Sequence, residues 1–134
     1  MVDATTPEIH FFEEIREKRK LTGELIQRGV QLFGKKLLKG LELAKDGKIR
    51  LITFQPSKRS VWEAGGSEAF YLVYPHLYCQ CHSFHFAMHS ETKPYCKHLI
   101  AQALAEQLTL FSRGEMLDDD LSTYLQEKLN AFKQ

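Results

Sequence analysis

Two short pairs of metal-ligand residues lie fourteen residues apart in the middle of the chain. Cys79 and Cys81 form the first pair, in "YCQCHSF", and Cys96 and His98 form the second, in "YCKHLI". Three thiolates and one imidazole make a complete tetrahedral ligand set for Zn²⁺. Because four protein ligands close the coordination sphere, such a site would be structural and not catalytic. The spacing therefore predicts one structural zinc ion.

Other interpretations of these residues stay open. Free cysteines are often buried as small hydrophobic residues, and one thiol can be a catalytic nucleophile if a base such as His82, His85 or His98 lies beside it in a cleft. Clustered thiols favour a metal, since a nucleophile needs only one, and thiolate-rich sets suit zinc or iron–sulfur. His82, His85 and His89 could replace a thiolate or form a second site, although we expect ordinary polar residues of a loop and a helix.

The bulk composition agrees with metal binding better than with a disulfide framework. Three cysteines are an odd number, whereas small disulfide-stapled secreted domains usually carry an even number. No apolar run approaches the roughly 18 residues of a membrane span, and the N-terminal sequence does not resemble a signal peptide. We therefore expect an intracellular protein, in which reduced cysteines are available as ligands.

Helical periodicity dominates residues 1–47, which precede the ligand residues. Apolar residues recur at steps of three and four over 25–41, and Thr22 can cap the start of that helix. Gly34 can end one helix and let a second begin directly afterwards. A charged helix is expected before them, over residues 8–20. The N-terminal third should therefore be a group of helices.

The first of these helices carries Phe11 and Phe12 side by side. Adjacent helical residues point about 100° apart, so we expect that both rings cannot face one core. An exposed ring would be a candidate for partner contact, because interaction subunits often display apolar side chains.

A three-stranded antiparallel meander is predicted for residues 48–75. Strands are expected at 49–55, 60–64 and 69–75, where β-branched and aromatic residues are enriched. The connections between them are too short for parallel crossovers, so the strands should pair antiparallel.

Helices are expected to follow the meander. A short helix can start at Ser83, a second runs over 95–108, and a third starts at about Asp118, where the helix dipole favours acidic residues. The apolar stripe of the third is Leu121, Tyr124, Leu125, Leu129 and Phe132. The fold class is therefore α+β in a single domain over residues 1–134. Its parts are the N-terminal helices (1–47), the antiparallel meander (48–75), a zinc-binding segment that leads into the C-terminal helices (76–108) and a C-terminal helix (116–132).

The residues around the ligands resemble the SWIM zinc finger. A strand with "YLV" (71–73) precedes the Cys-x-Cys pair, the aromatic Phe84 follows it, and "CKH" (96–98) opens a helix that continues "LIAQAL". The resemblance covers residues 68–108. It implies one structural Zn²⁺ ion, with the ligands Cys79, Cys81, Cys96 and His98.

A narrower resemblance extends to most of the remaining chain. The segments "LFG" (32–34), "LEL" (41–43), "IRLIT" (49–53) and "PSKRSVWEAGGS" (56–67) are similar to the small SWIM-domain subunit of the Shu complex. Members of that subfamily are not enzymes. They pair with a RecA-like recombinase paralogue and promote recombinase filament assembly on single-stranded DNA in homologous recombination. The resemblance therefore implies a nuclear, non-enzymatic adaptor, with indirect association to DNA and with partner-contact residues unassigned.

Direct nucleic-acid binding is the alternative function. Residues 1–60 carry a formal charge of +5 and residues 61–134 a charge of −4, and a basic half can attract nucleic acid. Near the ligand residues, only Lys93 and Lys97 are basic. The basic residues that could line a nucleic-acid surface are Lys35, Lys36, Lys39, Lys45, Lys48, Arg50, Lys58 and Arg59.

A thiol or zinc hydrolase is the third hypothesis. A closed ligand set leaves no position for a reactive water, and no paired carboxylates flank it. The sequence also has no Walker A motif for binding ATP. We therefore expect no enzymatic activity.

Overall fold

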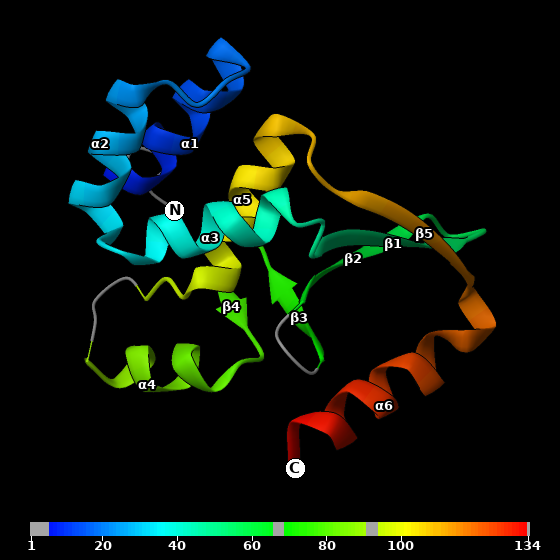
Figure 1. The fold of residues 1–134 in the computed structure, drawn as a ribbon. Helices are drawn as coiled ribbons and strands as arrows, with labels where there is room; N and C mark the ends of the chain where they lie inside the picture. The colour runs from blue at the N-terminus through cyan, green and yellow to red at the C-terminus, as the bar shows by residue number, and fades with distance from the viewer. Residues whose placement is uncertain (1–5, 66–68, 91–93, 134) are drawn as a thin grey trace.

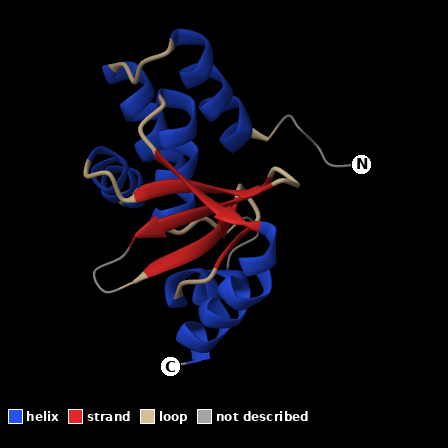
Figure 2. Ribbon diagram, turned by 90° about the vertical axis from the view of Figure 1, so that its right-hand side faces the viewer, coloured by secondary structure: helices blue, strands red, loops and turns tan. Residues whose placement is uncertain are grey.

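The structure of this chain is a computed structural model that describes residues 6–65, 69–90 and 94–133. It combines helices with a five-stranded sheet, which confirms the predicted α+β class. The N-terminal helices lie on one side of the sheet and the last helix lies on the other (Figures 1 and 2). None of the described helices has the length and apolar character that crossing a membrane requires.

Three helices form the N-terminal part, in agreement with the periodicity. They are α1 (Pro7–Lys18), α2 (Gly23–Phe33) and α3 (Lys36–Lys45). Thr6 and Thr22 cap α1 and α2, because each hydroxyl accepts a hydrogen bond from the backbone N–H three residues later, at 3.2 Å. Gly34 ends α2 with a φ of 68°, a left-handed conformation that glycine adopts without strain. The predicted cap and break are therefore confirmed.

The sheet has the strand order β4-β3-β2-β1-β5. Its strands are β1 (Ile49–Gln55), β2 (Arg59–Gly65), β3 (Phe70–Tyr74), β4 (Tyr78–Cys79) and β5 (Ser112–Leu117). The first three pair antiparallel in sequence order, which confirms the predicted meander. β4 adds an antiparallel partner to β3, and β5 pairs parallel to β1. Of the expected turn at 65–68, residues 66–68 lie outside the described residues.

The predicted strand count was wrong, because the described sheet has five strands, two more than the meander, and is mixed. β4 has only two residues, which is too short for a period-two pattern. β5 has the sequence "SRGEML", with a glycine, two charges and no β-branched residue, so its strand signal is weak. The segment 116–132 assigned to the C-terminal helix also began too early, although the helix start predicted at about Asp118 agrees with the structure. Met116 and Leu117 belong to β5, and α6 (Leu121–Lys133) follows a 3₁₀ turn at Asp118–Asp120.

Helix α5 (Lys97–Leu108) covers one face of the sheet and is the centre of the fold. Residues 98–105 of this helix are all buried. α3 packs closely across α5 at Gly40, where a Cβ atom would lie only 2.8 Å from Cγ2 of Ile100. The short helix α4 (His82–Ser90) precedes α5 and begins one residue before the predicted start. The sheet and the N-terminal helices therefore share α5 as a common packing surface.

The expectation that Phe11 and Phe12 cannot share a core was wrong. Both rings are buried, at 1% and 2% exposure. The ring of Phe11 lies 5.9 Å from that of Phe33 in α2, and the ring of Phe12 lies 5.5 Å from His76 and 6.4 Å from Tyr95. α1 is thus enclosed on two sides, so two directions about 100° apart can both lead into the core.

A buried charge cluster anchors α6 to the other face of the sheet. Glu63 of β2 accepts hydrogen bonds from Arg50 Nε at 2.5 Å, from Lys128 Nζ at 2.8 Å and from the Tyr124 hydroxyl. Burial opposes ionisation of Glu63, but Lys128, Tyr124 and Arg50 together hold its pKa below the ordinary value. The carboxylate therefore stays charged and binds α6 through two of its residues.

The apolar stripe predicted for α6 is only partly buried. Tyr124 lies in the interior, whereas Leu125 and Leu129 are 39% and 53% exposed. Leu121 is half-buried, and the side chain of Phe132 lies outside the described part of the structure. α6 is therefore held largely by polar contacts and leaves apolar side chains at the surface.

Replacing Glu63 by Gln should lower the free energy of unfolding by about 3 kcal/mol, because Arg50 and Lys128 would lose their counter-charge. Tyr124→Phe is the matched control and should cost only about 1 kcal/mol, since it removes one hydrogen bond. Denaturant unfolding of the metal-loaded proteins measures both. Because the pKa of Glu63 is lowered by folding, the wild-type advantage should fade as the pH falls through that pKa. Equal losses in the two variants would contradict the account.

Candidate metal centre

The first ligand pair lies at the end of β4. The Cys79 side chain is buried on the face of the sheet that α5 covers. Side chains alternate along an extended chain, so Gln80 points the other way. Its Oε1 accepts a hydrogen bond from the Leu72 N–H at 3.1 Å, and its Nε2 donates to the Lys128 carbonyl of α6 at 2.7 Å. Cys81 then returns to the side of Cys79, as the i, i+2 spacing predicted.

The second pair lies at the start of α5. Cys96 is the N-cap residue, and its sulfur accepts a hydrogen bond from the Leu99 N–H at 3.4 Å. Cys81 has the same relation to α4, because its sulfur accepts from the Phe84 N–H at 3.4 Å. The first N–H groups of a helix have no partner within the helix. Here they donate to sulfur, where they can offset the negative charge of a thiolate.

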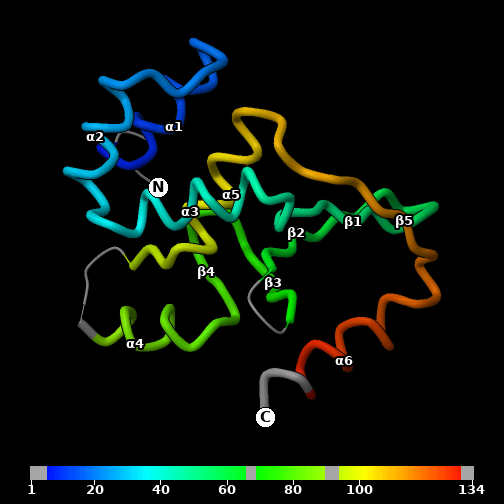
Figure 3. The backbone as a smooth tube through the Cα atoms, viewed as in Figure 1, coloured from blue at the N-terminus to red at the C-terminus, as the bar shows by residue number. Residues whose placement is uncertain are grey.

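The two pairs meet in one buried cluster. Figure 3 shows the end of β4 beside the start of α5. The ligand atoms all lie within 4.8 Å of one another, and no ligand side chain is more than 4% exposed. A tetrahedral zinc ion with bonds of about 2.3 Å to sulfur separates its sulfur ligands by about 3.8 Å. The cluster therefore has the composition and the size of a single tetrahedral site. Its members are Cys79, Cys81, Cys96 and His98.

Interactions within the cluster shift the pKa values of the three thiols in different directions. A hydrogen bond with Cys81 and burial raise the pKa of Cys79, while the same hydrogen bond lowers the pKa of Cys81. At Cys96 the contact with Cys79 lowers the pKa, but Cys81 and burial raise it to about 11. Three buried thiolates would need a cation, because uncompensated buried charge is costly, and a thiophilic cation such as Zn²⁺ fits this donor set.

His98 presents one ring nitrogen to the cluster. Its Nδ1 lies 4.0 Å from the Cys96 sulfur, and its buried Nε2 has no hydrogen-bond partner. The imidazole packs against the Tyr71 ring of β3, with centroids 5.1 Å apart. Tyr71 belongs to the "YLV" strand, so this strand supplies the surface that orients the histidine ligand.

The three histidines considered as alternative ligands lie on α4, outside the ligand cluster. His82 and His89 are exposed and His85 is half-buried. Within the described ranges, the Cys₃His cluster is the one group of at least three close His, Cys, Asp or Glu side chains of metal-ligand geometry. A second metal site therefore has no support in the part of the chain that the structure describes. The burial of all three thiols also does not suit a nucleophile that must reach a substrate.

Gln80 is the one residue of the region whose role the sequence did not reveal. It is 95% buried and forms both side-chain hydrogen bonds described above, while its backbone N–H donates to the Leu72 carbonyl at 3.0 Å. The available signal was its position between two ligands on an alternating strand, which requires it to face away from them. The hydrogen-bond partner of its Nε2 on that face belongs to α6, which lies far along the sequence.

Searches against protein-family models, curated proteins and solved structures find no match to this chain. The resemblance to the SWIM finger therefore stays a prediction that rests on its quoted residues.

Replacing Cys96 by Ser should abolish metal binding and leave the protein largely unfolded. The apparent binding energy of a structural zinc is about 10–16 kcal/mol, whereas a typical domain is stable by only about 5–15 kcal/mol. His89→Ala is the matched control, because His89 is exposed and outside the cluster. Elemental analysis and circular dichroism of the purified proteins should show one metal ion per folded chain in wild type and control. A folded wild-type chain that carries no metal would refute the site.

Proposed function

We propose that this chain is a zinc-stabilised, non-enzymatic adaptor subunit of a Shu-type complex. It would bind a RecA-like recombinase paralogue and promote recombinase filament assembly in homologous recombination, which implies a nuclear location. The observation that carries the proposal is the buried Cys-x-Cys and Cys-x-His cluster, placed at a strand end and a helix start in the order that the SWIM resemblance implies. The recombination role rests on that resemblance.

In this proposal Cys79, Cys81, Cys96 and His98 would hold the zinc ion. The ion would supply positive charge that offsets the thiolates and would link the end of β4 to the start of α5. Residues at and beside the ligands connect this link to two helices, α5 and α6. Cys96 and His98 fix the first turn of α5, and Gln80 fixes the C-terminal helix through the Lys128 carbonyl. A loss of the metal would therefore loosen both faces of the sheet.

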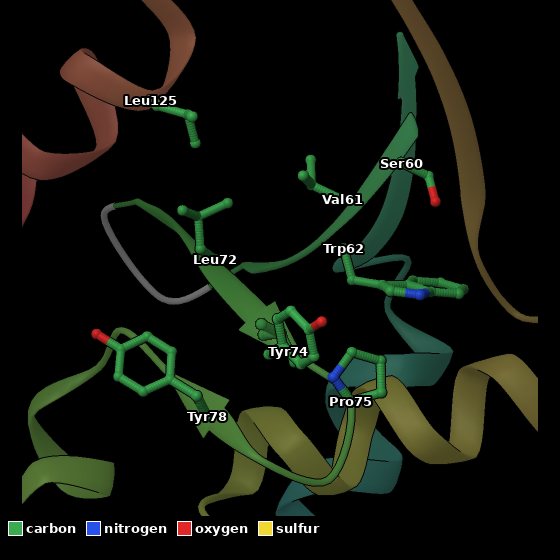
Figure 4. A pocket seen from close by; sticks show the side chains of 9 residues that line it. Ser60, Val61, Trp62, Leu72, Tyr74, Pro75, Tyr78 and Leu125 are labelled. Carbon is green, nitrogen blue, oxygen red and sulfur yellow. The ribbon is translucent and has the colours of Figure 1, made fainter. Parts of the chain in front are cut away.

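The surface beside α6 has the character expected of a subunit that works by binding. A groove of about 470 Å³ lies over β2 and β3, and Figure 4 shows Leu125 of α6 on one side of it, facing Leu72 and Val61. Tyr74 and Tyr78 are also at this surface. Exposed apolar side chains that gather around a groove often mark protein-binding sites. This groove supports the adaptor proposal, and we expect the recombinase paralogue to bind there.

Leu125→Glu should abolish or strongly weaken co-purification with a co-expressed RecA-like paralogue, because it places a charge in the apolar groove. Leu38→Glu is the matched control. Leu38 is likewise an exposed helical leucine, but it lies on α3, away from the groove lining. The measurement is the amount of paralogue retained by the tagged chain.

Two results would count against this proposal. Absence of association between the wild-type chain and any RecA-like paralogue would reject the adaptor function. Equal losses in Leu125→Glu and Leu38→Glu would reject the groove as the contact.

Direct nucleic-acid binding is less well supported. Lys36 Nζ donates to the Tyr95 carbonyl at 3.0 Å, and Arg50 forms an ion pair with Glu63. Two of the basic residues considered for phosphate contact are thus engaged within the fold. The described part of the ligand segment, residues 76–90 and 94–108, itself adds only Lys97 as a Lys or Arg residue, and this residue is exposed.

The purified chain should therefore show little binding to single-stranded DNA at about 100 mM salt. A fluorescence anisotropy titration at several salt concentrations checks this. Tight binding whose affinity falls steeply and linearly on a log-log plot against salt would instead show direct phosphate contact and favour the alternative.

A further inference from the structure

β5 forms one edge of the sheet, and among the described residues no strand pairs with its outer side. On its inner side β5 pairs with β1. After β5 the chain turns away from the sheet edge into α6 (Figure 1). The N–H and C=O groups on the outer side of an edge strand can pair with a strand of another chain. The residues that face outward decide which strand fits.

Backbone hydrogen bonds fix which residues of β1 face β5. Gly65 of β2 donates its N–H to the Lys48 carbonyl at 2.6 Å, directly before β1 begins. The backbone groups of successive strand residues point alternately to the two neighbours. The even-numbered residues of β1 therefore bond to β2, and odd-numbered residues such as Leu51 bond to β5.

The parallel alignment of β1 with β5 determines which residues of β5 have backbone groups that face β1. Leu51 is aligned with Arg113. In a parallel pair, a residue bonds to the two residues that flank its aligned partner. The backbone groups directed to β1 are therefore those of residues 112, 114 and 116. Those of Arg113, Glu115 and Leu117 point outward, away from the sheet.

The outward positions carry opposite charges around a glycine. Arg113 and Glu115 are both exposed, with Gly114 between them. If a second β5 pairs antiparallel with its centre at Gly114, each Arg113 lies opposite the Glu115 of the other copy. Both are outward residues, so each such pair also exchanges two backbone hydrogen bonds. Opposite charges in directly facing positions stabilise an antiparallel pair.

Other registers are disfavoured by the same charges. A shift to the neighbouring outward position brings Arg113 opposite Arg113 in one direction and Glu115 opposite Glu115 in the other. Facing like charges destabilise a strand pair. In the register centred on Gly114, the residues that face each other at the ends and at the centre of the strand pair are also compatible. Leu117, which is 61% exposed, meets Phe111 of the second copy, and the facing glycines have no side chains to clash where the strands approach most closely.

We propose that two copies of this chain pair through antiparallel β5 strands, with a two-fold axis at Gly114, to form one continuous sheet. The proposal is independent of the recombination role and of the groove beside α6.

Charge exchange tests the register. Light scattering and analytical ultracentrifugation of the full, metal-loaded chain over a concentration series should show a monomer–dimer equilibrium. Arg113→Glu and Glu115→Arg should each raise the dimer Kd at least about tenfold, because each variant turns two attractive pairs into repulsive ones. The double variant R113E/E115R should restore the wild-type Kd. A monomer at all concentrations, single variants with unchanged Kd, or a double variant without rescue would each overturn the proposal.

Hydrogen exchange of the wild-type chain tests the same geometry without substitutions. The amides of Arg113 and Glu115 should be protected at high concentration and exchange quickly on dilution. The amides of Gly114 and Met116 bond to β1, so they are the internal control and should be protected at both concentrations. Equal, concentration-independent exchange of Arg113 and Glu115 would contradict the pairing.

Discussion

The joining of a strand end to a helix start by four buried ligand side chains is the constraint on which the rest of the structure depends. Cys79 ends β4 and Cys81 directly precedes α4, while Cys96 caps α5 and His98 lies in its first turn. α5 is the surface on which the sheet, α1 and α3 all pack, with Gly40 allowing α3 to approach closely. Folded domains have a net stability of only about 5–15 kcal/mol, so a link between two elements of the core can be a large part of it.

The two faces of the sheet are connected through the ligand segment itself. Gln80 lies between two ligands, yet its side chain bonds to α6 on the opposite face. Glu63 holds the same helix through Tyr124 and Lys128. Because polar contacts hold α6, its leucines can remain at the surface. The Cys₃His cluster on one face is thus linked, through Gln80, to the helix that borders the groove on the other.

Local signals were sufficient for much of this fold. Thr22 and Gly34 act on the residues next to them in sequence. The two ligand pairs are short patterns whose residue types are typical of zinc sites. The features that the sequence did not predict depend on distant segments. β5 is a strand because β1 lies beside it, and the burial of Phe12 depends on elements that enclose α1 on a second side. The contact between Gln80 and α6 joins residues 48 positions apart, and no local pattern reports such a pairing.

The most direct test of the central claim is a zinc titration of the reduced chain after removal of metal by a chelator, followed by X-ray absorption at the zinc edge and by near-ultraviolet circular dichroism. The account predicts that one equivalent of zinc restores tertiary structure, with about three sulfur ligands at ~2.3 Å and one nitrogen ligand at ~2.0 Å. A stripped chain that keeps its tertiary structure, or a zinc ion bound largely by oxygen ligands, would contradict it.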